Sequence, residues 1–388
     1  MPSTVLRSVC AATLAAVVVA SPAVAAPAAP AAPGASGTAR GPRATKTVSE
    51  LLTELKKLYQ QAEEASEAYN GTASELKKRN TEAKKLAAAL GGARAALARS
   101  RDDAGRLARE QYQGRSDFSS YVQLLLSSDP EHALDQGYVI RRVAAGRATT
   151  LKRLTGAEKR AHELATASRK VLGKQRALTA RKKKDRDKVR ARLKKVETLL
   201  ATLTAQRIAE LARLERQRAE KAQEVLVASG ALAGSRRPSQ EGDEAVRYAI
   251  RQLGKPYVWG AEGPGSFDCS GLTSQAWASA GRTIPRTSQE QWRQLPRVSV
   301  SSLRPGDLVI YFPKATHVAL YIGNGLVVQA PRPGSQVKIS PVASNPLLGA
   351  VRPDPANAPL RTYDPPELPK GASDGADTGY SSVSAPGG

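Results

Sequence analysis

Hydrophobic and polar positions follow two different rhythms along the chain. Over residues 46–229, apolar residues recur every seven positions, and a second, less regular series lies three positions after the first. Such heptads predict long α-helices that pair along a seam, as in a coiled coil. The first series is Leu55, Ala62, Tyr69, Leu76, Ala83, Leu90, Leu97 and Ala104, and the second includes Leu58, Ala65, Leu86, Ala93 and Leu107.

The periodic region is divided near its middle. Pro130 cannot lie inside a helix, so the first long helix must end before it. Periodic positions resume between Leu164 and Leu214, which predicts an antiparallel helical hairpin over residues 46–229 with its tip near 114–136. The tip is unusually apolar, and it is either a small local core or a docking surface for another protein. Its apolar residues are Phe118, Tyr121, Val122, Leu124, Leu125 and Leu126.

The second rhythm belongs to a compact domain. Residues 230–240 form a Gly/Ser/Arg/Pro hinge, after which short alternating runs rich in Val, Ile, Tyr and Trp begin. Residues 241–353 have the length of a single domain. Residues 354–388 are rich in Pro, Gly, Asp and Ser and are predicted to be a disordered tail.

The first 45 residues predict export. Arg7, a short apolar stretch and an Ala-Val-Ala site ending at Ala25 are typical of a secretory signal peptide over residues 1–25. Residues 26–45 are an Ala/Pro-rich linker. We therefore expect a secreted protein on the cell-wall side of a bacterial membrane. Cleavage would leave Cys269 as the only cysteine, either an inert buried residue or a reactive thiol.

Charge narrows the list of partners. The chain carries a formal net charge of +24, of which the 40 basic and 23 acidic residues of 46–229 supply +17. The densest basic run, Arg181 to Lys184, has no interleaved aromatic residues to stack on bases. In an exported chain this favours anionic wall polymers or lipid head groups over nucleic acid. Two Cys and three His are too few for zinc fingers, and no metal or cofactor is expected. No apolar run is long enough for an integral membrane protein.

The candidate chemistry lies in the C-terminal domain. Asp268 is a natural N-cap, which places Cys269 in the first turn of a helix. A helix N-terminus favours the thiolate, so we expect a lowered thiol pKa, and its free N–H groups can stabilise an oxyanion. His317 begins an alternating strand that leads through an Asn-Gly turn into a strand ending near Gln329. Gln329 could then orient the imidazole as the third group of a papain-like constellation.

At these residues the sequence resembles the NlpC family of cell-wall cysteine peptidases. The similar motifs are GKPYVWG, FDCSGLTSQAW, PRTSQEQW, LRPGDLVIY, HVALYIGNG and VVQAP, in this order. The resemblance covers under a third of the chain. It implies an α+β papain-like domain, preceded here by a long antiparallel α-helical coiled coil, that hydrolyses peptidoglycan stem peptides, typically between D-γ-glutamate and a diamino acid.

The resemblance also implies roles for individual residues. Cys269 would be the nucleophile, His317 the base and Gln329 the third polar group, where many family members have His or Glu. Tyr257 matches a tyrosine near the cysteine, and Asp268 and Ser270 match positions that line a pocket for the substrate amine. The hairpin is similar to those of division-associated wall hydrolases, which dock on a membrane partner such as the FtsE–FtsX complex. Two alternatives stay open: an inert wall-binding or scaffolding protein, and an acyltransferase or amidase of the same fold.

Overall fold

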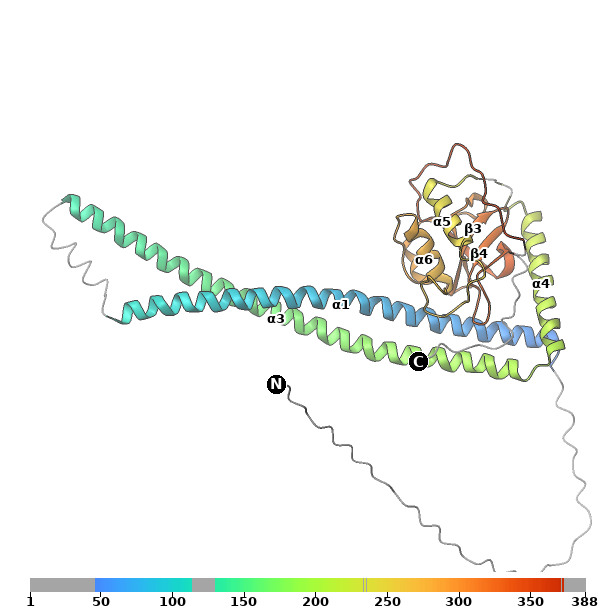
Figure 1. Cartoon of the computed structure of the whole chain (residues 1–388), viewed down its shortest axis with the longest axis horizontal. Helices are drawn as coiled ribbons and strands as arrows, with labels where there is room; N and C mark the ends of the chain where they lie inside the picture. The colour runs from blue at the N-terminus through green and yellow to red at the C-terminus, as the bar shows by residue number, and fades with distance from the viewer. Residues whose placement is uncertain (1–45, 114–129, 233, 235, 371, 373–388) are drawn as a thin grey trace, which may run out of the picture. The chain divides into compact units, whose positions relative to one another are not determined.

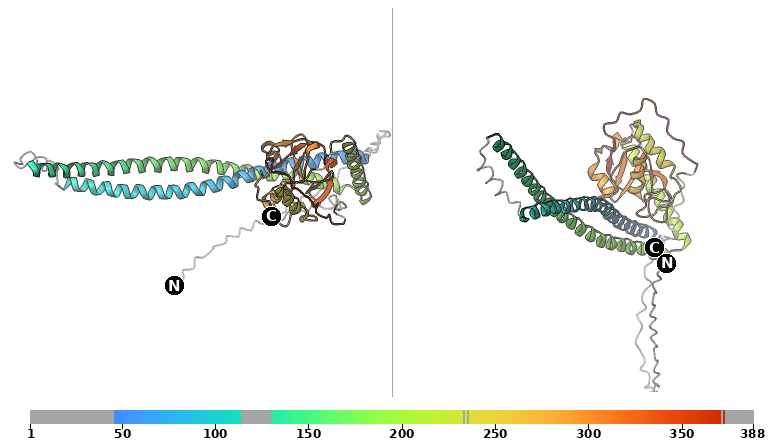
Figure 2. Two further views of the ribbon diagram at one scale, coloured as in Figure 1. Left: turned by 90° about the horizontal axis from the view of Figure 1, so that it is seen from above. Right: turned by 60° about the vertical axis from the view of Figure 1, so that its left-hand side comes forward.

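Two long helices form the N-terminal part of the structure, a computed structural model that describes residues 46–113, 130–232, 234, 236–370 and 372. Helix α1 spans Val48–Tyr112 and helix α3 spans Pro130–Ala201. They run alongside each other (Figures 1 and 2). Their direction is antiparallel, because Arg192 of α3 bonds to Gln61 near the start of α1, whereas Arg101 near its end pairs with Glu158.

The predicted seam is the face that α1 buries. Every position of both heptad series, from Leu55 to Leu107, is buried or half-buried. The leucine-rich part of this seam lies near the start of α1, where three apolar clusters join α1 to the end of α3 and to the next helix. Their buried members are Leu51, Leu52, Leu55, Tyr59, Ala62, Val189, Leu193, Val196, Leu200 and Leu211.

The second arm of the hairpin is two helices. Helix α3 ends at Ala201, and helix α4 spans Ala205–Ala228, with the Thr204 side chain accepting a hydrogen bond from the Arg207 N–H as its N-cap. Heptad spacing alone did not reveal this break, because Leu211 and Leu214 continue an apolar pattern on both sides of it. Leu211 is fully buried against Leu51 and Leu52 of α1. The predicted tip lies largely outside the described residues, and Pro130 is the first residue of α3.

A six-stranded antiparallel sheet forms the C-terminal domain, in the order β1-β6-β2-β3-β4-β5. The elements are α5 (Gln240–Ile250), α6 (Cys269–Ser279), α7 (Ser288–Gln294), β1 (Arg297–Val298), the 3-10 turn η1 (Val300–Ser302), β2 (Leu308–Tyr311), β3 (His317–Gly323), β4 (Leu326–Gln329), β5 (Lys338–Pro341), the 3-10 turn η2 (Val342–Ser344) and β6 (Leu347–Val351). The predicted Asn-Gly turn joins β3 to β4, and both Asn324 and Gly325 have positive φ.

The sheet has apolar residues on both faces. One face packs with α5 and α6 around the fully buried Trp277 and Phe267. The other face carries Val309, Tyr311 and their neighbours, and Leu226 of α4 packs against it. The prediction of an α+β domain preceded by long antiparallel helices is confirmed. Over the described residues, none of these helices combines the length and the hydropathy that crossing a membrane requires.

Candidate active site

Cys269 is the first residue of α6, as its sequence context predicts. The Asp268 carboxylate caps the helix by accepting the Gly271 N–H at 2.6 Å. A Cβ atom at position 271 would lie 2.1 Å from the Ala261 carbonyl oxygen, so only glycine fits against this loop. These contacts fix the Cys269 thiol at a helix N-terminus, where it is only 2 % exposed.

His317 and Gln329 lie side by side on neighbouring strands. Gln329 Oε1 is 2.7 Å from His317 Nε2, which places the imidazole proton on Nε2 when the ring is neutral. The other ring nitrogen, Nδ1, is then the basic one, and it lies 3.3 Å from the Glu63 carboxylate of α1. The hydrogen bond that the sequence predicted between the third group and the histidine is therefore present.

The remaining predicted residues surround Cys269. Asp268 accepts hydrogen bonds from the Gly260 N–H and from Arg286, a nearly buried guanidinium that also donates to Ser270 Oγ at 2.8 Å. Tyr257 is buried, and its pKa is raised by burial and then by the charge of Cys269. All six predicted residues are therefore in or beside the site, but Asp268 and Ser270 are engaged by protein groups.

Helix α1 supplies three side chains that enter this site. Glu67 accepts hydrogen bonds from Ser270 Oγ at 2.6 Å and from the Ser288 N–H at 2.8 Å, and its Oε1 is 3.7 Å from Cys269 Sγ. Glu63 faces His317, and Asn70 donates to Asp268 at 2.9 Å. The helix thus lies across the cysteine and the histidine and contacts both.

This cover changes the chemistry of the thiol. Burial, followed by the charges of Glu67 and Asp268, raises the pKa of Cys269 well above its ordinary value. The expectation of a lowered thiol pKa is wrong for this conformation, because loss of solvent and the nearby carboxylates outweigh the helix N-terminus. A neutral thiol is a poor nucleophile, so the site is closed both sterically and electrostatically.

The carboxyl and imidazole groups respond to the same burial. Burial and the neighbouring Asp268 raise the pKa of Glu67 to about 7. For His317, burial acts to lower the pKa, but the Glu63 carboxylate opposes it and the pKa is raised overall. Each of these groups therefore holds a proton more tightly in the closed arrangement than it would in water.

Sequence reasoning missed Glu63, Glu67, Asn70 and Arg286. The first three are spaced four and three residues apart, so they form a polar stripe on one face of α1. A coiled-coil pattern contains many such charged positions, and nothing in the spacing distinguishes this one. Arg286 stands inside the PRTSQEQW motif, where the only basic residue was a usable signal.

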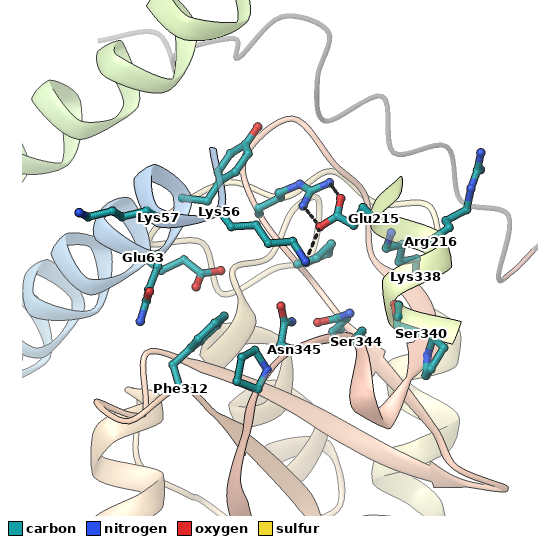
Figure 3. Close-up of a pocket in the computed structure, with 18 of the residues that line it drawn as sticks. Lys56, Lys57, Glu63, Glu215, Arg216, Phe312, Lys338, Ser340, Ser344 and Asn345 are labelled. Carbon is teal, nitrogen blue, oxygen red and sulfur yellow. Dashed lines mark hydrogen bonds and ion pairs between the residues drawn. The ribbon is translucent and has the colours of Figure 1, made fainter. Parts of the chain in front are cut away.

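Two cavities flank α1 where it crosses the site, each of about 740 Å³. One lies on the Arg286 side and is also lined by Tyr69 and Asn70. The other is lined by Gln329, the partner of His317, and by Glu63, which Figure 3 labels. Helix α1 therefore contributes to the walls of both cavities.

Comparison with known proteins shows which family this domain resembles. Residues 254–349 match the model of the NlpC/P60 family. These residues are an NlpC/P60 domain. A probable endopeptidase of Corynebacterium glutamicum is 41 % identical over 128 residues, which are 33 % of this chain and 61 % of the relative. A probable endopeptidase of Mycobacterium tuberculosis is 40 % identical over 108 residues, 28 % of each chain. The chain thus spans less than two thirds of these curated relatives.

One solved structure is similar to part of the chain. RipD of Mycobacterium tuberculosis, described as a non-catalytic NlpC/p60 domain protein with an adaptation to peptidoglycan-binding function, is 32 % identical, with a TM-score of 0.27. The match covers 30 % of this chain and 98 % of that one.

Proposed function

We propose that this protein is a cysteine endopeptidase that hydrolyses an amide bond in the stem peptides of peptidoglycan, the bond between D-γ-glutamate and a diamino acid. The observation that carries the proposal is the pairing of Cys269 at the start of α6 with the His317–Gln329 hydrogen bond, inside an NlpC/P60 domain. The relatives described as probable endopeptidases support the same reaction class.

In the proposed mechanism, His317 Nδ1 takes the proton of the Cys269 thiol and the thiolate attacks the scissile carbonyl carbon. N–H groups in the first turn of α6 stabilise the oxyanion. His317 then gives its proton to the leaving amine, the C–N bond breaks and a thioester remains. Water, deprotonated by His317, hydrolyses the thioester and restores the thiol. Gln329 holds the imidazole ring in the tautomer that these reaction steps need.

We propose further that α1 keeps the enzyme inactive until it is displaced. Glu67 and Glu63 contact the cysteine and the histidine, and the raised pKa of Cys269 opposes formation of the thiolate. In the exported protein, the hairpin would also deliver the enzyme to a membrane division partner such as the FtsE–FtsX complex through its apolar tip, and its basic surface would meet anionic wall polymers. The apolar residues in the sequence of 114–129 support docking on such a partner.

Digestion of purified peptidoglycan tests the activity. The full chain with Glu67→Lys, designed to displace α1, should release stem-peptide fragments whose masses identify the bond. Adding Cys269→Ser should abolish release without loss of folded structure by circular dichroism. His317→Ala should be nearly as inactive, whereas Gln329→Ala should cost about 1–3 kcal/mol of transition-state stabilisation, since one hydrogen bond to the catalytic imidazole is lost.

The outcome also separates the proposal from its alternatives. Peptidoglycan binding without any released fragment, by the chain with Glu67→Lys, would contradict hydrolysis and favour a wall-binding protein. Transfer of the acyl group to an added amine in preference to water would favour an acyltransferase. Equal inactivation by Gln329→Ala and His317→Ala would show that Gln329 does more than orient the ring.

A further inference from the structure

The proposed mechanism indicates on which side of Cys269 the leaving part of the substrate would lie. In the proposed reaction, His317 must protonate the leaving nitrogen, so the leaving fragment lies on the histidine side of Cys269. Gln329, bonded to His317, lines one of the two cavities beside α1, whereas Arg286 and Glu262 line the other. The chemistry of the cavity that Gln329 lines therefore bears on which leaving fragments the enzyme accepts.

Arg332 is a cationic group of the catalytic domain that lines this cavity and binds a carboxylate. Its guanidinium donates two hydrogen bonds to Glu215 of α4, at 3.0 and 2.8 Å. Lys56 of α1 lies 3.5 Å from the same carboxylate, and Figure 3 shows Lys56 and Glu215 pointing toward each other. Parallel N–H donors on one carboxylate are the geometry by which arginine recognises such groups.

The catalytic domain positions Arg332 through its own contacts. Ser335 Oγ accepts the Arg332 N–H at 3.2 Å and donates to its carbonyl oxygen at 2.6 Å, which closes a turn directly after β4. The turn follows Gln329 by three residues. These two contacts lie within the catalytic domain, so they hold the Arg332 backbone three residues from Gln329 when the helices are displaced. In the closed chain the guanidinium also lies over the Tyr59 ring of α1, 5.1 Å from its centroid.

A purely structural tie explains this pair less well. Arg332 and Glu215 are only 12 and 15 % exposed, so both charges lose much of their solvent when they pair. Desolvation offsets most of the attraction in such a pair, and a well-packed apolar contact would hold the helices as firmly. The pair is better explained if Arg332 is needed for a carboxylate in its own right.

We propose that Arg332 binds a free carboxylate on the leaving fragment of the substrate, and that Glu215 occupies this position in the closed chain. The inference rests on the proposed endopeptidase function. It makes Arg332 a specificity-determining residue and names the substrate class: stem peptides whose residue on the amine side of the cut bond carries an unblocked carboxylate. An amidated stem lacks the charge that Arg332 recognises.

Two synthetic stem peptides test the proposal, one with this carboxylate free and one with it converted to the carboxamide. Glu67→Lys and Glu215→Gln together are designed to open the site and release Arg332. The full chain with both changes should cleave the carboxylate peptide with a kcat/KM about 10- to 100-fold higher than that for the carboxamide peptide. Adding Arg332→Gln should remove this preference by slowing cleavage of the carboxylate peptide alone. Arg332→Lys should restore part of it, and Arg251→Gln, at an exposed arginine beyond the end of α5, should leave it unchanged.

Binding gives a readout that does not depend on turnover. With Cys269→Ala added, isothermal titration calorimetry should show the same preference for the carboxylate peptide and the same loss with Arg332→Gln. Equal effects of Arg332→Gln on both peptides, in kinetics or in binding, would overturn the proposal and leave Arg332 as a tie to α4. Failure to cleave either peptide with Cys269 intact would contradict the endopeptidase function instead, while the binding comparison would still decide the role of Arg332.

Discussion

The two ends of α1 follow the same heptad pattern but bury different kinds of side chain. Toward the hairpin tip, the seam consists mainly of alanine and half-buried leucine, and the acidic residues Asp102 and Glu110 are exposed. Near the start of α1, large apolar residues are buried, and so are the polar side chains of Glu63, Glu67 and Asn70. The far end shows what pairing with α3 requires. At the near end, Glu63, Glu67 and Asn70 additionally contact the NlpC/P60 domain.

This difference supports the proposal that the near end of α1 is released from the active site. Buried carboxylates are costly unless they are paired, and Glu67 lies close to Asp268, a group of like charge. An apolar helix face would cover the same site more stably. Polar contacts to the catalytic groups instead give a closed state that a competing partner or substrate can displace.

Reversing one buried charge at the near end should have the largest effect. Glu67→Lys removes the carboxylate that accepts hydrogen bonds from Ser270 and Ser288 and places a cation near Arg286, at a cost to closure of about 3–5 kcal/mol. We expect stem-peptide hydrolysis to rise by at least about 100-fold. Glu110→Lys, at an exposed position on the same helix, is the matched control and should leave the rate unchanged. Equal rates for the two variants would show that α1 does not restrain the enzyme.

Truncating a leucine should destabilise the near end of the hairpin much more than the far end. Leu55 is 1 % exposed, and Leu55→Ala should destabilise the near end by about 3 kcal/mol through lost burial and a cavity. Leu151→Ala, on α3 toward the tip, removes a side chain that is 55 % exposed and should change stability by less than about 0.5 kcal/mol. Hydrogen exchange of the α1 and α3 amides measures both. A similar loss of protection in both variants would mean that the seam is energetically uniform.

The closed state should weaken as pH rises. Burial raises the pKa of Glu67 from 4.5 to about 7, so protonation favours closure fully below about pH 4.5, and this contribution is lost as pH rises through about 7. The raised pKa of His317 acts in the same direction. Between about pH 5 and 8, alkylation of Cys269 in the wild-type chain should therefore rise about tenfold more than in Glu67→Gln. Parallel pH profiles for the two chains would contradict this role of Glu67.

The smallest predicted effect comes from a single neutral hydrogen bond. Asn70→Ala removes the bond to Asp268 and should weaken closure by about 1 kcal/mol, which corresponds to a roughly fivefold faster alkylation of Cys269. Asn80, farther along α1, accepts a hydrogen bond from Gln175 of α3 at the surface, and Asn80→Ala should leave the alkylation rate unchanged. A larger effect at Asn80 than at Asn70 would mean that closure depends on the hairpin as a whole.

Local signals predicted much of the fold and the catalytic constellation. The heptads located the buried face of α1, Asp268 located the start of α6, and the Asn-Gly turn brought His317 next to Gln329. Each of these depends on residues close together in the sequence or on one hairpin. The family resemblance supplied the assignment of Tyr257, whose position beside Cys269 no local pattern indicates.

Contacts between distant segments were beyond such reasoning. Glu67 lies about 200 residues before Cys269, and only the folded arrangement brings the two within 3.7 Å. The same is true of Glu215 and Arg332, which stand 117 residues apart. This is also why the thiol pKa was predicted in the wrong direction: the helix N-terminus can be read from the sequence, whereas the covering helix and its carboxylates cannot.

The rate at which an uncharged alkylating reagent modifies Cys269 tests the central claim, that α1 closes the active site, most directly. Mass spectrometry of the peptide containing Cys269 gives this rate for the full chain, for Glu67→Lys and for Glu110→Lys, under native conditions at one pH. The account predicts slow modification of the wild-type chain and of Glu110→Lys, and modification at least about 100-fold faster in Glu67→Lys. Rapid and equal modification of all three chains would contradict it.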